Sequence, residues 1–209
     1  MENKFQPPKE DLPKDEEGIR DIKTQLKNLG ILVGDMHGKI LDIGAGEGSL
    51  VKYLKSNTDA EVIGLDPYKK EDSEDIVQGE VKNLPFEDET FDTILSHASI
   101  PNVFINMYSP DYSEESKKEI ENMIIKSFSE IMRVLKKGGK AYLAPIKISD
   151  RYESERALHE GVLAGIKHLQ SQNFDTEFTK IETYTDPDTK ESCDFYRLSI
   201  KKDTFPKEA

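Results

Sequence analysis

The chain has 209 residues, a length that suits one domain with a single large core. Its 29 basic and 41 acidic residues give a formal net charge of -12, which argues against nucleic acid or an anionic membrane as a partner, because phosphate binding needs clustered Lys and Arg. No apolar run approaches the ~18 residues of a membrane span, and the first residues lack the apolar core of a signal peptide.

Cysteine and histidine are sparse. The one cysteine, Cys193, permits neither an internal disulfide nor a thiolate metal site. The histidines are scattered and form no pair with the spacing of metal ligands: His37, His97, His159 and His168. We therefore expect a metal-free protein of the cytoplasm.

The amino-terminal part of the chain divides in two. Residues 1–15 mix three prolines with charged side chains, and we expect a flexible tail there, or an arm that orders over a bound ligand. Apolar residues then recur at helical spacing over 16–29, and Gly30 provides the stop, so this segment is predicted to be a helix.

The most informative stretch starts with the largely apolar run 40–43, which predicts a strand buried on both faces. Gly44, Gly46 and Gly48 follow at alternate positions, and apolar residues at helical spacing begin after Ser49. Glycine adopts backbone dihedrals that other residues avoid and lets a ligand touch the main chain, while a helix start presents unpaired N–H groups. In open α/β sheets, ligands bind at such turns. A tight connection without a ligand is the alternative.

A second strand is predicted over 61–65, and it ends in a carboxylate. Asp66 lies about 20 residues beyond the glycines, the spacing at which a carboxylate accepts hydrogen bonds from ribose hydroxyls. The two features together indicate a cofactor that contains adenosine. The dinucleotide fingerprint G-x-G-x-x-G would place its third glycine at Ser49, so the match to nicotinamide cofactors is incomplete.

The remaining elements follow from periodicity. We predict strands over 76–80, 91–96, 176–184 and 193–200, and helices over 48–56, 113–136 and 150–171. The last two strands alternate apolar and polar residues around a turn, as an antiparallel pair does. The connection 99–113 is longer than usual and holds aromatic residues and methionine, so it either lines an apolar acceptor or covers the core.

Local signals mark the ends of two elements. Ser113 is expected to cap the helix that follows it, and the pair 138–139 of glycines is expected to end that helix. Phe91 and Asp92 open the fourth strand. We expect Phe91 in the core and Asp92 in a structural role.

Three segments resemble class I S-adenosylmethionine-dependent methyltransferases of the small-molecule type, those like methyltransferase domain 11. Residues 41–48, which read L-D-I-G-A-G-E-G, resemble the first motif of that family. Residues 79–86, which read G-E-V-K-N-L-P-F, are similar to its G-D-A-x-x-L-P-F segment. Residues 133–139 are similar to its R-x-L-K-P-G-G turn, with Lys137 where proline is usual. The resemblance covers roughly residues 18–201.

The resemblance implies a fold. We expect the α/β class, with a Rossmann-like doubly wound sheet of about seven strands, mostly parallel with an antiparallel last strand, and helices on both faces. A single methyltransferase domain would occupy residues 16–201. The flexible tail 1–15 would precede it, and a C-terminal tail, 202–209, would follow it.

The resemblance also implies a site for S-adenosyl-L-methionine. Gly44 and Gly46 would lie against the methionine part of this cofactor. Asp42 would hold the turn or the cofactor's amino group, and Asp66 would accept hydrogen bonds from the ribose hydroxyls.

Further contacts are implied at the next two strand ends. Glu80 would accept from the adenine amino group and the backbone N–H of Val81 would contact the ring, with a solvated Glu80 as the alternative. Ser96 and His97 leave a strand close to the reactive methyl group, where relatives line the cofactor and the acceptor. His97 is the candidate general base, because histidine exchanges protons near neutral pH, and lining the pocket without acid–base chemistry is its alternative.

The implied function is transfer of a methyl group from S-adenosyl-L-methionine to an O, N or C atom of a small-molecule acceptor, with S-adenosyl-L-homocysteine as product. Such transfer is an in-line displacement, so the protein mainly supplies positioning and desolvation. The segment 96–101 lacks the Asn/Asp-Pro-Pro-Tyr/Phe motif, which argues against a DNA adenine methyltransferase. A methyltransferase acting on protein or RNA, a non-catalytic cofactor-binding protein and a nicotinamide-linked oxidoreductase stay open. No pattern addresses the oligomeric state.

Overall fold

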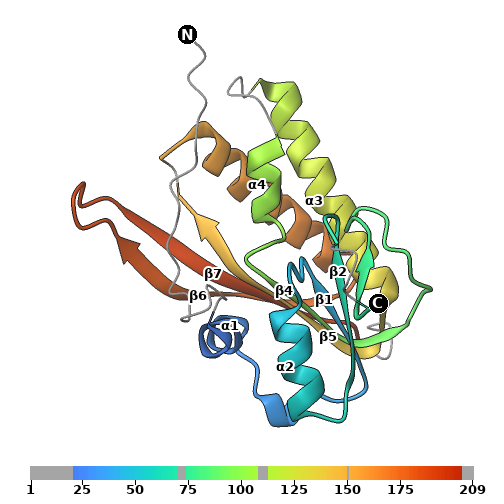
Figure 1. Cartoon of the computed structure of the whole chain (residues 1–209). Helices are drawn as coiled ribbons and strands as arrows, with labels where there is room; N and C mark the ends of the chain where they lie inside the picture. Colours follow the sequence, from blue (N-terminus) through green and yellow to red (C-terminus); the bar gives the residue numbers. More distant parts are fainter. Residues whose placement is uncertain (1–20, 70–73, 108–112, 150, 204–209) are drawn as a thin grey trace.

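A computed structural model describes residues 21–69, 74–107, 113–149 and 151–203. These residues contain one seven-stranded sheet (Figure 1). Its strands are β1 (Lys39–Ile43), β2 (Glu61–Asp66), β3 (Ile76–Gln78), β4 (Phe91–His97), β5 (Leu135–Ile148), β6 (Asp175–Thr185) and β7 (Ser192–Lys201). They lie in the order β3-β2-β1-β4-β5-β7-β6.

Among these strands, β7 runs in the direction opposite to the other six. It pairs antiparallel with β5 and β6, and every other neighbouring pair is parallel. The strand order reverses where β1 lies between β2 and β4, which is the topological switch point of a doubly wound sheet. The predicted fold class is therefore confirmed. β6 and β7 form a long hairpin that projects beyond the rest of the sheet (Figure 1).

Helices cover both faces of the sheet. In the described segments they are α1 (Ile22–Leu29), α2 (Ser49–Asn57), α3 (Glu114–Val134), α4 (Glu153–Ser171) and the 3-10 helices η1 (Val33–Asp35) and η2 (Asn102–Met107). α1 and α2 lie on one face, and α3 and α4 lie on the other (Figure 1). None of the helices in these segments has the length and hydrophobicity needed to cross a membrane.

Burial on both faces explains the apolar run of β1. Leu41 and Ile43 belong to the core shared with α3 and α4, whereas Ile40 belongs to the smaller core shared with α1 and α2. Successive side chains of a strand point to opposite faces, so a strand covered on both sides needs apolar residues throughout. Asp42 is the exception in β1, and it belongs to the site described below.

α1 has sharp ends. Asp21 caps it with its carboxylate, which accepts hydrogen bonds from two backbone N–H groups of the first turn. The helix predicted over 16–29 thus begins at Ile22, and residues 16–20 lie outside the described segments. Gly30 ends the helix in the left-handed conformation, as predicted.

α3 starts as predicted, with Ser113 as its cap, but it ends earlier than predicted. The prediction that the glycines 138–139 end this helix is wrong, because β5 already begins at Leu135. The N–H of Thr90 donates to Val134 O over 2.8 Å. The carbonyl at the helix end therefore bonds to the chain before β4 instead of to a further helical turn.

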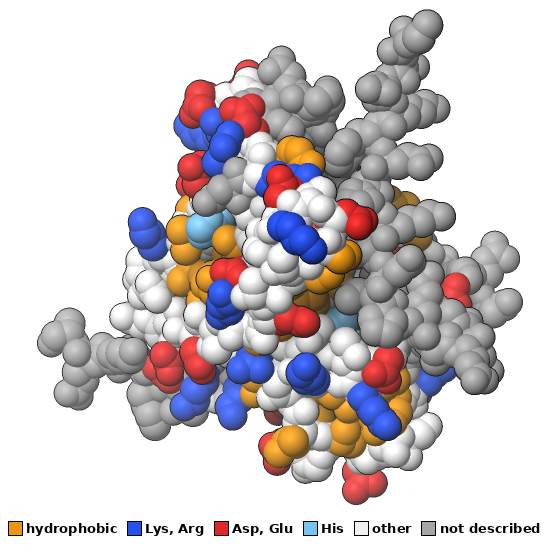
Figure 2. All heavy atoms as spheres, turned by 90° about the vertical axis from the view of Figure 1, so that its left-hand side faces the viewer, with side chains coloured by type: hydrophobic (Ala, Val, Ile, Leu, Met, Phe, Trp, Pro, Cys, Tyr) orange, Lys and Arg blue, Asp and Glu red, His pale blue; other side chains and the backbone are white. Residues whose placement is uncertain are grey.

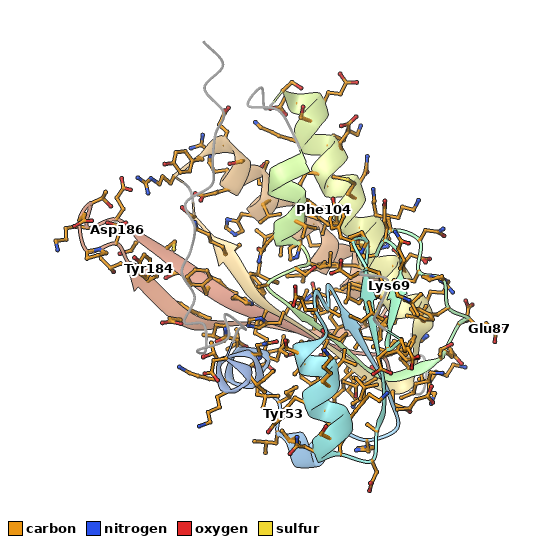
Figure 3. All side chains as sticks on the ribbon, viewed as in Figure 1. Tyr53, Lys69, Glu87, Phe104, Tyr184 and Asp186 are labelled. Atoms are coloured by element: carbon orange, nitrogen blue, oxygen red, sulfur yellow. The ribbon has the colours of Figure 1, made fainter. Side chains whose placement is uncertain are left out.

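The connection predicted over 99–113 is partly helical, since η2 occupies 102–107. Phe104 of η2 is 1% exposed and belongs to the core shared with α3 and α4 (Figure 3). This burial supports the core-covering role for Phe104. Residues 108–112 lie outside the described segments.

The predicted tails lie mostly outside the described segments, which leave out 1–15 and 204–209. Lys202 is described, and its Nζ donates to Met132 O over 2.9 Å and to Leu135 O over 2.7 Å. The first residue of the predicted C-terminal tail is thus fixed against the end of α3.

Phe91 and Asp92 have the structural positions expected of them. Phe91 is 0% exposed. Asp92 Oδ2 accepts hydrogen bonds from Lys39 N over 2.8 Å and from Lys136 Nζ over 2.7 Å. Burial acts to raise the pKa of Asp92, but these hydrogen bonds outweigh it and hold the pKa below its usual value. Asp92 thereby ties β4 to the starts of β1 and β5.

Arg133 joins α3 to the segment between β3 and β4. Its guanidinium donates to Leu84 O over 3.0 Å and to Phe86 O over 2.8 Å. It also pairs with Asp88 and Glu130, each at 2.8 Å. The similarity to the R-x-L-K-P-G-G turn therefore marks an anchor for the loop before β4.

The contact between α3 and α4 depends on glycine. Gly161 and Gly165 lie one turn apart on α4 and face α3. A Cβ on Gly165 would lie 2.8 Å from the ring of Phe128 and 3.0 Å from Ile124. The two helices therefore pack more closely here than a side chain would allow.

Replacing Gly165 by Ala should lower the free energy of unfolding by about 1–3 kcal/mol, because the added methyl group overpacks the contact with Phe128. Without such overpacking, alanine would stabilise a helix by about 1 kcal/mol relative to glycine. Urea denaturation measures the difference. Gly34→Ala is the control, because a Cβ there would meet nothing within 4 Å. Equal or higher stability of Gly165→Ala would contradict the close packing.

Candidate functional site

The turn after β1 has a backbone conformation that glycine adopts readily and other residues avoid. Gly44, Gly46 and Gly48 have φ angles of 79°, 57° and 77°. The N–H groups of Gly44 and Ala45 donate to Leu65 O over 2.8 and 3.1 Å. The turn is therefore fixed to the end of β2, and α2 begins directly behind it.

This glycine turn has a filled side and an open side. A Cβ on Gly44 would overlap the side chain of Ser99, which follows β4. A Cβ on Gly46 would meet no atom within 4 Å. Gly46 thus leaves room for a ligand against the backbone. Sequence reasoning missed Ser99, because its contact with the turn arises only when β1 and β4 pair.

Asp42 is a carboxylate buried at the end of β1. It is 3% exposed and shares the face of Ile40, two residues earlier. Burial, together with the negative charge of Asp66, raises the pKa of Asp42 to about 7. A cationic group beside these two carboxylates would favour the ionised form of Asp42.

Asp66 ends β2 next to the open side of the glycine turn. Its Oδ2 accepts a hydrogen bond from Gly46 N over 2.9 Å, and its Oδ1 accepts one from Tyr68 N over 2.8 Å. A carboxylate has about four lone-pair sites, so Asp66 can hold the turn and still accept from ligand hydroxyls.

The residues expected at adenine lie beyond the end of β3. The strand predicted over 76–80 is shorter than predicted and ends at Gln78. The chain turns directly afterwards, because Asn83 N donates to Glu80 O over 3.0 Å. This turn removes Glu80 from the strand.

Glu80 and Val81 differ sharply in exposure. The Glu80 side chain is 65% exposed, and its Oε2 lies 3.3 Å from Lys82 Nζ. Val81 is 6% exposed and packs into the core below α3 and α4. An ion pair as exposed as that of Glu80 contributes little to stability, so Glu80 can exchange Lys82 for another partner at small cost.

Ser96 faces the interior. It is 0% exposed, and its Oγ accepts a hydrogen bond from Ile100 N over 3.1 Å. The hydroxyl therefore stabilises the chain that leaves β4. A contact between Ser96 and a cofactor would be made by its backbone.

His97 shares the face of Asp42. Asp42 is level with Leu95 of β4, and His97 lies two residues further along that strand. His97 is 5% exposed, and its Nε2 lies 3.3 Å from Nδ2 of Asn28 in α1. Sequence reasoning missed Asn28. The available signal was a polar residue between the apolar positions of a short helix, and Asn28 is indeed buried.

These features define a class of protein. A sheet whose strand order reverses at β1, with a glycine turn open at Gly46 and a carboxylate at the end of β2, is typical of doubly wound α/β proteins that bind nucleoside cofactors. The pair of carboxylates, Asp42 and Asp66, fits a cofactor that carries positive charge. Within the described segments, no group of three or more His, Cys, Asp or Glu is arranged to hold a metal ion.

Comparison with known proteins identifies the family. Residues 41–143 match the family model described as a methyltransferase domain. The chain belongs to the class I S-adenosyl-L-methionine-dependent methyltransferases, and the cofactor of that family is S-adenosyl-L-methionine.

Individual relatives are distant. The sterol 24-C-methyltransferase of Debaryomyces hansenii is 25% identical over 143 residues, which cover 62% of this chain and 33% of that protein. The chain thus spans about a third of the length of this curated relative. A Methanococcus maripaludis protein assigned as an S-adenosyl-L-methionine-dependent methyltransferase is 22% identical, with a TM-score of 0.50 over 89% of this chain and 85% of the other. Phosphoethanolamine N-methyltransferase 2 of Haemonchus contortus, solved with S-adenosyl-L-methionine, is 16% identical, with a TM-score of 0.53 over 87% of this chain and 52% of the other.

Replacing Asp42 by Asn should stabilise the cofactor-free protein at neutral and alkaline pH. The pKa of Asp42 is about 7 in the folded protein against an ordinary value of 3.8. The folded state therefore holds the Asp42 proton more tightly than the unfolded state, and the wild type loses stability as the pH rises from about 4 to about 7. A pKa about three pH units higher in the folded state corresponds to about 4 kcal/mol.

Urea denaturation at pH 5 and pH 8 tests this expectation. The gain in unfolding free energy from Asp42→Asn should be larger at pH 8 than at pH 5 by about 2–3 kcal/mol. Asp59→Asn is the control for removal of one negative charge, because Asp59 precedes β2 and its side chain is exposed. A gain from Asp42→Asn that does not depend on pH would contradict a raised pKa.

Proposed function

We propose that this chain transfers a methyl group from S-adenosyl-L-methionine to a small-molecule acceptor, with S-adenosyl-L-homocysteine as product. The observation that carries the proposal is the glycine turn, which is open at Gly46 beside the carboxylates of Asp42 and Asp66. S-adenosyl-L-methionine supplies a methyl group on a cationic sulfur, already activated for displacement. The chain therefore has to bind, orient and exclude water.

The residues of the glycine turn would hold the methionine part of the cofactor. Gly46 would lie against it, because the space where a side chain would stand is empty there, and Gly44 would approach it through its backbone, because Ser99 fills the corresponding space at Gly44. Asp42 would face the ammonium group, whose positive charge favours the ionised carboxylate. Asp66 would accept from the ribose hydroxyls with the lone pairs that its two backbone hydrogen bonds leave open.

Glu80, Val81 and Ser96 would bind the remaining parts of the cofactor. Glu80 would exchange Lys82 for the adenine amino group, and the N–H of Val81 would contact the ring. The bonds of Arg133 to the following loop support a fixed position for this segment. Ser96 would contribute its backbone at the end of β4.

His97 would be the general base if the acceptor must lose a proton before or during transfer. Its place at the end of β4, on the face of Asp42, supports a position near the methyl group. Asn28 would orient the imidazole through the contact with Nε2 at 3.3 Å. Lining the pocket without proton transfer is the alternative role.

The charge of the chain supports a small-molecule acceptor. RNA binding needs a basic stripe or patch, whereas the net charge is -12. On the face shown in Figure 2, Lys and Arg side chains are interspersed with Asp and Glu side chains. The single cysteine and the acidic surface are in keeping with a location in the cytoplasm, which we also propose.

Calorimetric titration with S-adenosyl-L-homocysteine, with NADH as the control ligand, tests the cofactor. We expect micromolar binding of S-adenosyl-L-homocysteine and none of NADH. Asp66→Ala should weaken that binding by about 10–100-fold, because it removes charged acceptors of the ribose hydrogen bonds. Asp66→Asn keeps one acceptor oxygen for the turn, so this variant should lose less affinity than Asp66→Ala.

Asp59→Ala is the matched control for Asp66, since Asp59 precedes β2 and Asp66 ends it. It removes the same charge at the opposite end of β2 and should leave the affinity for S-adenosyl-L-homocysteine unchanged. Unchanged affinity of a folded Asp66→Ala protein would refute the ribose assignment, and binding of NADH alone would refute the methyltransferase proposal.

Replacing His97 by Ala should lower kcat for methyl transfer by about 100-fold if His97 is the base, while the affinity for S-adenosyl-L-homocysteine stays within about 3-fold. The measurement is the rate of S-adenosyl-L-homocysteine release with an acceptor found by screening. His159→Ala on α4 serves as the control. An unchanged kcat would leave His97 as a lining residue.

A further inference from the structure

Glu155 is a buried carboxylate that the cofactor site does not use. It lies in the first turn of α4, and its side chain is 9% exposed. Its Oε1 is 3.3 Å from Lys147 Nζ, whereas its Oε2 is enclosed by protein and has no hydrogen-bond partner among the described residues. Burying a carboxylate oxygen without a partner costs several kcal/mol, so this arrangement calls for a reason other than stability.

A line of contacts joins the glycine turn to η2. The side chain of Ser99 lies against Gly44, where a Cβ would overlap it. Val103 N donates to Ser99 O over 3.0 Å, so the first turn of η2 is bonded to Ser99. Asn102, the first residue of η2, follows Ser99 by three residues.

The same line continues from η2 to Glu155. Asn102 Nδ2 donates to Pro145 O over 2.6 Å, and its Oδ1 accepts from Lys147 N over 3.4 Å. Lys147 then pairs with Glu155. Asn102 follows β4 in η2, Lys147 is near the carboxyl end of β5, and Glu155 follows β5 in α4. All three thus come from the side of the sheet where the strands end and where ligands bind in this fold.

The strand register gives a length scale for this edge. His97 is level with Ala144 of β5, and Lys147 lies three residues further along. The register of β5 is irregular between Leu143 and Ile146, so the Cα atom of Lys147 lies at most about 10 Å beyond the level of His97, the length of three fully extended residues. A small molecule of ordinary size spans that distance.

The junction between β5 and α4 is open to solvent. A hollow of about 520 Å³ is lined by Ile148, Ser149 and Arg151 from the junction and by 191–194 from the start of β7. Its volume suits a small molecule. Neither Lys147 nor Glu155 is among these lining residues, although Lys147 directly precedes Ile148 in β5. Lys147 is the more exposed member of the ion pair, at 26%, and Glu155 Oε2 is closed to solvent, so an acceptor reaches Glu155 only when Lys147 changes its rotamer.

We propose that Glu155 binds the methyl acceptor, and that its Oε2 takes a hydrogen bond from an N–H or O–H group at the end of the acceptor remote from the methylated atom. This inference rests on the function proposed above. The acceptor is then an amine or alcohol that carries this donor group at the end remote from the reacting atom. Lys147 holds Oε1, so that Oε2 is left to the acceptor.

The first test is the stability of the free protein. Glu155→Gln removes the charge and keeps the shape of the side chain. The melting temperature of this variant should be unchanged or higher, because an oxygen kept for a ligand does not stabilise the fold. Glu130→Gln should lower it, since the Glu130 carboxylate accepts from Leu84 N and from Arg133. If Glu155→Gln lowered the melting temperature as much as Glu130→Gln does, Glu155 would have a structural role and the proposal would be overturned.

The second test is binding to protein saturated with S-adenosyl-L-homocysteine. The probes are small amines and alcohols, each paired with the analogue in which a methyl group replaces the donor; phenethylamine, 2-phenylethanol and propylbenzene are one such set. At least one donor compound should bind about 10-fold tighter than its analogue. That advantage should be lost in Glu155→Gln and kept in Glu153→Gln, whose side chain is 56% exposed in the same helical turn.

Two outcomes would overturn the proposal. In the first, a donor compound still binds Glu155→Gln more tightly than its methyl analogue does. In the second, no donor compound of the panel binds the wild type more tightly than its methyl analogue. Glu155→Asp, with a shorter side chain, should retain part of the advantage. The affinity for S-adenosyl-L-homocysteine should be the same in wild type and Glu155→Gln. Absence of that affinity in the wild type would refute the proposed function, whereas cofactor binding without a donor advantage would refute only the role of Glu155.

Discussion

The close approach of three chain segments at the glycine turn is the constraint on which the rest of the site depends. Gly44 and Ala45 bond to the end of β2, and Ser99 fills the space that a side chain on Gly44 would take. Because Val103 N of η2 donates to Ser99 O, the same turn also positions the chain that leaves β4. One backbone conformation, accessible to glycine, thus places the end of β2, the exit of β4 and the open surface at Gly46 relative to one another.

The buried carboxylate of Asp42 couples cofactor binding to protons and to stability. In the free protein, burial and Asp66 favour its neutral form. A cofactor with positive charge reverses that preference, so binding below about pH 7 should release a proton. The free protein therefore carries a carboxylate that is unfavourable until a cation is present, as is common where function and stability conflict.

The local sequence pattern predicted most of the helices and strands, whereas contacts between distant parts of the chain determined the remaining features. The strands around 40–43 and 61–65 were predictable because burial on both faces requires apolar residues in succession. The end of α3 was not, because it depends on a hydrogen bond from Thr90, a residue far away in sequence. The roles of Asn28 and Glu155 could not be predicted either. Their roles arise from single contacts across the fold, with His97 and Lys147, which no periodicity records.

The two borders of the sheet are protected from further strands in different ways. β3, at one border, has only three residues, which is too short to template another chain. β6, at the other, is long and ends at the hairpin tip that carries Tyr184 and Asp186 (Figure 3). Its register is irregular between Lys180 and Glu182, and both of these exposed residues are charged. A foreign strand approaching β6 would meet a bulge and charged side chains, so the projecting hairpin resists edge-to-edge aggregation.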